Sequence, residues 1–535
     1  MQTREFMNES QQHREEQKKF SSAQWRFMLS SMLVYANFIF VRKNLSMAQP
    51  GMLEEGVIST YAIGAILSVY GIIYGISLFV NSFWADKFNG RIILTICLSV
   101  SALVNFLFGC TSITILFAIF WLINAWTQGI CFPACSKMLT HWIHPKELAT
   151  KMSFWLTSIN YGKITILGLC SLLLGLGLNW RWCFWIPAAL TAMIAMFCFF
   201  CVNASPTEAG VEELKIEAAA THKPSSEITT ADRCRLVFGN RVIWLVAIAA
   251  FFVNTVTYSF LDWGPTFLKQ FKGIPVFMGG WMMIAFELAA IIGSVFAGWI
   301  TDKAFKGRGV RTCVIYMFCA ALFVFGFWAL PNGGTELRYA CSSDNMPKPE
   351  EVRTALKDFD KHIVIKYQPQ EKQLVIHTVY LNSSNDKKIG DFKDIDSYVT
   401  TKLQQRFSAS NITLMSRNET VPTSIWIATL ILMGAGFCLL GTKCLLGVIA
   451  SNQATKEAAA MSNGFIGIMG HASSIVSGIG VAHMTEMFGW NVTLSLTAIF
   501  ALMSMFFFAL AWNAKASGYK IDYTEKETAT ATNKA

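Results

Sequence analysis

The chain has 535 residues, of which 53% are hydrophobic and only 15% are Asp, Glu, Lys or Arg. A soluble domain averages about 25% charged residues, and here the apolar residues form long blocks rather than helical stripes. This distribution excludes a disordered chain and a disulfide-stabilised scaffold, and it argues against a water-soluble enzyme. We therefore expect a polytopic membrane protein, with the lipid bilayer as its main partner.

Twelve segments of the sequence are long and apolar enough to cross a membrane. A hydrocarbon core about 30 Å thick is crossed by about 20 apolar residues in a helix. The first six segments lie at 26–48, 59–83, 91–111, 113–136, 150–175 and 180–202, and the other six at 242–268, 277–300, 312–330, 423–447, 459–484 and 490–512. The prediction is an all-α membrane protein with 12 transmembrane helices.

The placement of basic residues predicts the orientation in the membrane. Ten Lys and Arg side chains lie in the short loops after the second, fourth, eighth and tenth segments, against three in the loops on the other side. Short loops rich in Lys and Arg remain in the cytoplasm, which places both termini there. The net charge of +10 also fits nucleic-acid binding, but no compact basic patch with interleaved aromatic residues occurs, so we expect no nucleic-acid partner.

The two halves of the sequence repeat. The stretch 84–91 (WADKFNGR) matches 298–308 (GWITDKAFKGR), with Asp86 and Asp302 offset by 216 residues, whereas Trp180 and Trp490 are offset by 310 residues. The offset grows by about the length of the polar stretch 331–421, so one copy carries an insertion. This plan resembles the major facilitator superfamily, in which two pseudo-symmetric six-helix bundles enclose a site near the bilayer midplane.

The repeat also predicts the domain boundaries. The expected parts are an N-terminal cytoplasmic tail (1–25), the N-terminal six-helix bundle (26–203), a cytoplasmic linker (204–241), helices 7–9 of the C-terminal bundle (242–330), an extracytoplasmic insert (331–421), helices 10–12 (422–514) and a cytoplasmic tail (515–535).

The insert between helices 9 and 10 is expected to be a small α+β subdomain. Residues 350–360 and 394–407 have helical patterns, and 362–367, 373–381 and about 412–415 have the β-branched and aromatic content of strands. The insert lies on the side away from the cytoplasm, where it could dock a protein partner.

Ionisable residues inside the apolar segments are functional candidates, because each costs several kcal/mol in hydrocarbon. Basic groups outnumber acids among them, so a cavity that they line would attract an anion. Arg42 is the strongest candidate, because its planar guanidinium suits phosphate or carboxylate oxygens. Tyr35 shares its helix face. The alternative is that Arg42 and Lys43 extend to the membrane surface.

Lys163 is the expected second anchor for the anion, because it lies in the middle of its segment. Asn160 precedes it by one turn, and Glu287 could pair with it or act as a protonatable gating residue. Further candidates for substrate contact are Gln128, Asn254, Lys443 and His471. Their alternative role is helix packing, through small neighbouring residues or hydrogen bonds between helices.

Two charged turns are expected to act in gating or coupling. Each places an acid and bases around a tight cytoplasmic turn, where they could pair and hold the halves in one conformation; the residues are Asp86, Lys87 and Arg91, and Asp302, Lys303 and Arg308. No nucleotide-binding or metal-binding motif such as GxxxxGK[ST] or HExxH occurs. We therefore expect no cofactor, no metal and no enzymatic activity.

Four stretches carry a closer resemblance: 41–50 (VRKNLSMAQP), 128–142 (QGICFPACSKMLTHW), 153–162 (SFWLTSINYG) and 261–268 (LDWGPTFL). They resemble the organophosphate:phosphate antiporter family of the major facilitator superfamily. The resemblance covers nearly all of the chain except the termini and the 331–421 insert. It implies a transporter that moves an organic phosphate by alternating access, and we expect a monomer in a bacterial inner membrane.

The resemblance also implies site residues. In this family two arginines related by the pseudo-two-fold axis hold the phosphate; the first falls on Arg42 and the second on Thr257. A histidine falls on Ile159 and a lysine on Leu78, whereas Tyr74, Gln128 and Glu287 match. The site is therefore expected to be remodelled, and a carboxylate becomes a plausible substrate.

The leading hypothesis is a secondary transporter of a small organic anion. A transport-deficient membrane sensor and a proton-coupled anion:cation symporter are the alternatives. Substrate identity, coupling and the direction of transport are open at this point.

Overall fold

The computed structural model describes residues 2–143, 145–211, 230–330, 334–341, 349–356, 364–368, 373–378, 395–407, 412–420, 425–454 and 458–514. The helices of the first half are α1 (Gln2–Glu54), α2 (Thr60–Lys87), α3 (Gly90–Cys110), α4 (Thr114–Gln128), α5 (Cys131–Trp142), α6 (Pro145–Leu156), α7 (Ser158–Gly175) and α8 (Trp182–Cys201). The linker contains η1 (Thr207–Ala209) and α9 (Thr230–Phe238). The second half contains α10 (Arg241–Gln270), α11 (Val276–Lys303), α12 (Gly309–Ala329), α15 (Ile425–Gln453), α16 (Ala459–Ala472), the π-helical turn η4 (Val476–Gly480) and α17 (Val481–Leu510).

Among the described residues, ten helical segments are long and apolar enough to cross a membrane. The predicted segment 26–48 lies in α1, which is outside this set and carries Arg42 and Lys43. The predicted segments 459–484 and 490–512 both fall in one candidate, Met461–Leu510, whose helix is interrupted at Gly489 with φ 76°. These two differences explain why the described residues give ten candidates and the sequence predicts twelve segments.

Residues 2–25, predicted as a tail, continue α1 beyond the apolar segment. Of the predicted linker, α9 is a helix, and residues 212–229 lie outside the described part. The predicted C-terminal tail 515–535 lies outside it as well.

Small residues allow the helices that surround the centre of the molecule to approach one another closely. A Cβ added at Gly162 of α7 would lie 2.3 Å from the carbonyl oxygen of Ala36 in α1. In the second half, a Cβ at Gly436 of α15 would lie 2.5 Å from the carbonyl oxygen of Phe286 in α11. These contacts place Lys163 beside α1 and Glu287 beside α15.

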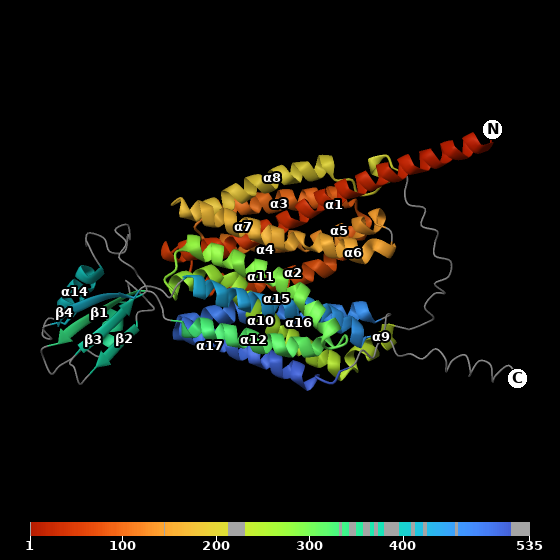
Figure 1. The fold of residues 1–535 in the computed structure, drawn as a ribbon. Coiled ribbons are helices and arrows are strands. Elements are labelled where there is room, and N and C mark those ends of the chain that lie inside the picture. Colours follow the sequence, from red (N-terminus) through yellow and green to blue (C-terminus); the bar gives the residue numbers. More distant parts are fainter. Residues whose placement is uncertain are drawn as a thin grey trace.

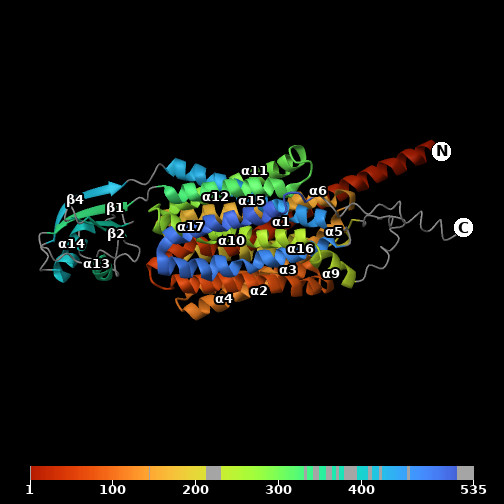
Figure 2. The same cartoon turned by 90° about the horizontal axis from the view of Figure 1, so that it is seen from below.

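The first-half and second-half helices form two neighbouring groups (Figures 1 and 2). Helices α1, α3, α7 and α8 pack together, and α10, α12, α16 and α17 pack together. The insert projects from one end of the helical body, and the N-terminal end of α1 from the opposite end.

Polar contacts join the halves at the end nearest the insert. Lys269 of α10 pairs with Glu54 of α1, and the N–H of Tyr61 in α2 donates to the carboxylate of Glu486 in α17 at 3.0 Å. Thr266 also donates to Gln49, at 3.2 Å. The two halves are therefore held together at this end.

The 331–421 stretch contains β1 (Gly334–Cys341), α13 (Pro349–Ala355), β2 (Val364–Gln368), β3 (Gln373–Thr378), α14 (Ile395–Arg406) and β4 (Ile412–Thr420). The strands form an antiparallel sheet in the order β2-β3-β1-β4. With this order of elements, the topology is the βαββαβ arrangement of ferredoxin-like folds. The core of the insert contains Leu337, Tyr339 and Ile376 from the sheet, packed with Val399 and Leu403 of α14.

Strand β1 was not predicted from the sequence. It pairs with both β3 and β4, so distant neighbours complete its hydrogen bonding. Strand β4 extends to Thr420, beyond the predicted 412–415, because it pairs along the whole of β1.

Candidate functional site

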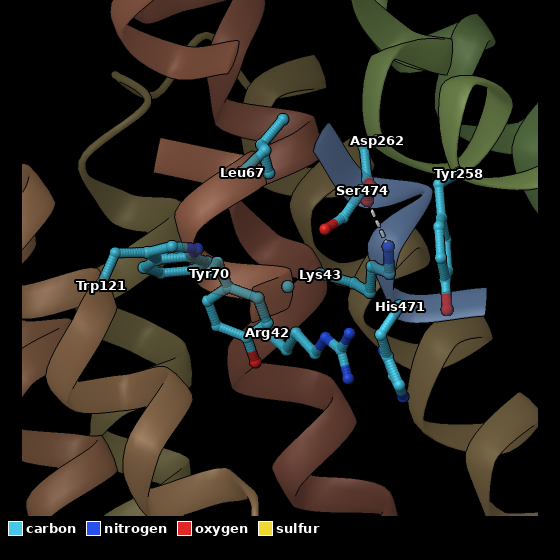
Figure 3. A pocket seen from close by; sticks show the side chains of 10 residues that line it. Arg42, Lys43, Leu67, Tyr70, Trp121, Tyr258, Asp262, His471 and Ser474 are labelled. Atoms are coloured by element: carbon cyan, nitrogen blue, oxygen red, sulfur yellow. Dashed lines mark hydrogen bonds and ion pairs between the residues drawn. The ribbon is translucent and has the colours of Figure 1, made fainter. Parts of the chain in front are cut away.

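A small cavity lies between the two halves. Its lining comes from α1, α2 and α4 on one side and from α10 and the α16–η4 region on the other (Figure 3). The lining residues are Arg42, Lys43, Leu67, Tyr70, Gly71, Trp121, Tyr258, Asp262, His471 and Ser474.

Arg42 extends into this cavity (Figure 3). Its Cζ atom lies 4.5 Å from the ring centroid of Tyr74 and 4.9 Å from that of Tyr70. Such cation–π contacts stabilise a guanidinium that is partly removed from water. Among the described residues, no carboxylate forms an ion pair with Arg42. The guanidinium can therefore bind an anion without breaking an existing ion pair.

Gln128, a predicted contact residue, supports Tyr70 from behind the cavity. The Tyr70 hydroxyl donates to Gln128 Oε1 at 2.8 Å, and Gln128 Nε2 donates to Asn124 Oδ1 at 3.2 Å. Asn124 Nδ2 donates in turn to the carbonyl of Val41 at 3.1 Å. This buried chain fixes the Tyr70 ring and the backbone next to Arg42.

Two ion pairs connect the halves near the cavity. Lys43 of α1 pairs with Asp262 of α10 (Figure 3). Lys163 of α7 pairs with Glu287 of α11: its Nζ lies 3.1 Å from each carboxylate oxygen and donates to Oε2. Glu287 has no exposed surface. In this structure the charge of Lys163, the predicted second anchor, is therefore compensated by a buried carboxylate.

Lys443 lies on α15, with Nζ 4.6 Å from the ring centroid of Tyr258. His471 lies against Tyr74, with 5.5 Å between the ring centroids. Tyr258 and His471 both line the cavity. The structure thus brings the α15 lysine to the edge of the same site as Arg42.

Of the predicted contact residues, Arg42 and His471 line the cavity, and Tyr35, Asn160 and Asn254 are among those that do not. Tyr35 stacks on Trp155 at 4.3 Å between centroids; although it shares a helix face with Arg42, seven residues separate them by about 10 Å along the helix. Asn254 donates to the carbonyl of Ala250 at 2.8 Å. Asn160 is half-buried on α7. Thr257, at the expected second-arginine position, is buried and donates to its own helix at 2.7 Å.

Sequence reasoning missed Tyr70, Trp121, Tyr258 and Ser474. Tyr70 precedes Tyr74 by four residues, so their shared helix face was a usable signal. Tyr258 and Trp121 resemble ordinary apolar residues of a membrane segment in the sequence, and nothing local distinguishes them.

The first charged turn contacts the linker. Arg91 Nη1 lies 3.9 Å from Glu208 Oε2, and Asn89 donates to Glu208 Oε1 at 2.5 Å. The Asp86 side chain lies outside the described residues, and Lys87 is exposed. In the second turn Asp302 and Lys303 are exposed and Arg308 is half-buried, and the ion pairs found in the described part of the chain involve none of these three.

The fold is that of a membrane carrier, and the comparisons with known proteins agree. Residues 28–340 match the model of the Major Facilitator Superfamily. The chain belongs to this superfamily, and within it to the organophosphate:phosphate antiporter family, as its sequence motifs predicted. It is accordingly a multi-pass membrane protein of a transporter family, which confirms that it is not an enzyme.

Among its relatives is the glycerol-3-phosphate transporter of Bacillus subtilis, 33% identical over 310 residues, or 56% of this chain and 69% of that protein. The membrane sensor protein UhpC of Escherichia coli is 27% identical over 59% of this chain and 73% of its own length. A solved structure of a bacterial homologue of the human lysosomal transporter Spinster, inward-facing and unoccupied, aligns with a TM-score of 0.64 at 12% identity, covering 92% of this chain and 97% of that one. This last likeness concerns the fold alone.

Proposed function

We propose that this protein is a secondary active transporter of a small organic anion, an organophosphate or a carboxylate, with Arg42 as the main anion-binding residue. The observation that carries the proposal is the Arg42 guanidinium, which lies in a cavity between the halves against the rings of Tyr70 and Tyr74. Arg42 is half-buried, and a cation inside a membrane protein is costly unless it is paired, so a site of this kind gains by binding an anion. The relative named a glycerol-3-phosphate transporter supports an organophosphate.

The proposed transport mechanism is alternating access between two six-helix bundles. In this arrangement the protein has twelve transmembrane helices in a bacterial inner membrane. Both termini lie in the cytoplasm, and the insert lies on the other side of the membrane. The contacts Glu54–Lys269 and Tyr61–Glu486 join the halves on the insert side, so they would separate when the cavity opens outward. The two charged cytoplasmic turns would then act on the opposite side.

Lys163 takes the role of a second anchor when its pair with Glu287 opens. The Lys163–Glu287 and Lys43–Asp262 pairs each cross between the halves. An incoming anion competes with the carboxylate for the lysine, and this competition links binding to rearrangement of the halves.

The test is uptake of labelled glycerol 3-phosphate, hexose 6-phosphate and dicarboxylates into proteoliposomes. Arg42→Ala abolishes uptake, whereas Arg311→Gln, a change on α12 outside the cavity, leaves it intact. Lys163→Ala lowers uptake. Uptake by Arg42→Ala at the wild-type level would show that Arg42 is not the anion-binding residue.

A sensor is the second candidate, favoured by the UhpC relative. A sensor binds the anion but does not accumulate it, so binding by the purified protein without uptake would select this function. Vesicles loaded with phosphate, compared with vesicles under an imposed proton gradient, separate exchange from proton-coupled symport.

A further inference from the structure

The charges around the cavity do not balance. Besides His471 and the tyrosines, four basic and two acidic side chains lie in or beside it: Arg42, Lys43, Lys163, Lys443, Asp262 and Glu287. The two carboxylates are each used by one lysine, in the pairs Lys43–Asp262 and Lys163–Glu287. Within the described residues, Arg42 and Lys443 form no ion pair with a carboxylate. Two positive charges therefore remain uncompensated.

These two charges face the same side chains from opposite halves. Lys443 contacts the Tyr258 ring, and Tyr258 lines the cavity together with Arg42. In Figure 3 the Arg42 guanidinium extends from α1 toward His471, on the side of the cavity where Tyr258 lies. An anion held by Arg42 at this position therefore lies on the side of the cavity lined by Tyr258, the residue whose ring Lys443 contacts.

An anion with two charges satisfies this arrangement better than an anion with one. Arg42 and Lys443 are both half-buried, so each has lost part of its hydration without a carboxylate in the described residues to offset the loss. A singly charged ligand compensates one of them, whereas a doubly charged oxyanion compensates both. Because the desolvation cost of both cations is already present without ligand, the second negative charge adds a large favourable interaction.

We propose that Lys443 binds the anion together with Arg42 while Lys163 is still paired with Glu287, and that the site selects doubly charged oxyanions over singly charged ones of similar shape. This inference rests on the proposed function and specifies its substrate class. Phosphate monoesters and dicarboxylates share the required charge. Selectivity then depends on the lysine of α15, a position that lies in the other half from Arg42.

The test compares matched ligands by thermal stabilisation of the purified protein at pH 7.5. Methyl phosphate is a dianion at this pH, because its second pKa is about 6, and dimethyl phosphate is a monoanion. Succinate and monomethyl succinate form the same contrast for carboxylates. In at least one of these two ligand pairs, the wild-type protein is expected to bind the dianion with an apparent affinity at least about tenfold higher than the monoanion. One charge-assisted hydrogen bond contributes a free energy of this size.

Lys443→Gln is expected to remove this preference by weakening dianion binding while leaving monoanion binding within about twofold, and Lys443→Arg to restore it. Lys306→Gln, in the turn after α11, is the matched control. If Lys443→Gln does not fold, Lys443→Met is compared with the wild-type protein in the same way, and the same loss of the dianion preference is expected.

An unchanged dianion preference in folded Lys443→Gln, or equal wild-type affinities for the two members of both pairs, would overturn the role of Lys443 and leave the anion transporter standing. Absence of any anion binding by the wild-type protein would overturn both.

Discussion

The pair between Lys163 and Glu287 provides a direct test of how this membrane protein tolerates buried charge. Glu287 is fully buried, and Lys163 Nζ lies 3.1 Å from both of its oxygens. Lys163→Met leaves a carboxylate without its cation in the interior. Breaking a buried pair by removing one partner costs about 3–5 kcal/mol. Replacing both partners together costs little, because no uncompensated charge remains.

These values predict an unequal double-mutant cycle. Lys163→Met lowers the free energy of unfolding by about 3 kcal/mol or more, and Glu287→Gln by about 1–3 kcal/mol, because the amide still accepts a hydrogen bond and Lys163 is partly exposed. The variant with both changes is expected to lie within about 1 kcal/mol of the wild-type protein. The coupling energy is therefore several kcal/mol.

The assay is the melting temperature of the four proteins in one detergent without ligand. A loss of 3 kcal/mol corresponds to roughly 6–12 °C for a cooperative unit of 150–250 residues. The reasoning is refuted if the effects of the single changes simply add in the double variant. It is also refuted if Lys163→Met melts within about 1 °C of the wild-type protein.

Three further predictions concern other parts of the molecule. A Cβ at Gly64 would lie 2.4 Å from a side chain of α17. Gly64→Val should therefore separate the halves and raise cysteine labelling from the outer side. Gly298→Val is the control and should not do so, because a Cβ at Gly298 would have no neighbouring atom within 4 Å. Burial lowers the pKa of Lys272, in the loop after α10, from 10.5 to about 8. Between these pH values the folded protein binds fewer protons than the unfolded chain, so its melting temperature relative to that of Lys272→Met should rise from pH 8 to pH 10.5. A difference in melting temperature that does not change with pH would contradict this. In the insert, Leu403→Ala truncates a fully buried side chain and should lower the free energy of unfolding by about 2–5 kcal/mol. The measurement is the rate of proteolysis of the insert, which should increase. Met415→Ala changes an exposed position and should leave this rate unchanged.

The sequence determined the class of protein and showed that cations outnumber acids inside the apolar segments, because both depend on local composition. Whether a stretch of about 20 residues favours hydrocarbon is a sum over those residues, and a cation inside such a stretch is visible without any knowledge of its neighbours. The internal repeat and the motif around Arg42 are also sequential features. For these reasons the family and Arg42 as a cavity residue were within reach of the sequence.

Only the tertiary structure decided which charges meet. Lys163 and Glu287 are 124 residues apart, and Lys43 and Asp262 are 219 apart. Their pairing depends on the rotation and depth of four helices, which the glycine contacts of α1 with α7 and of α11 with α15 help to fix. The same packing turned Gln128 into a support for Tyr70 and placed Tyr258 between the cavity and Lys443. The charge left over after pairing is a property of the assembled helices, because a cation remains free only when no carboxylate reaches it in space.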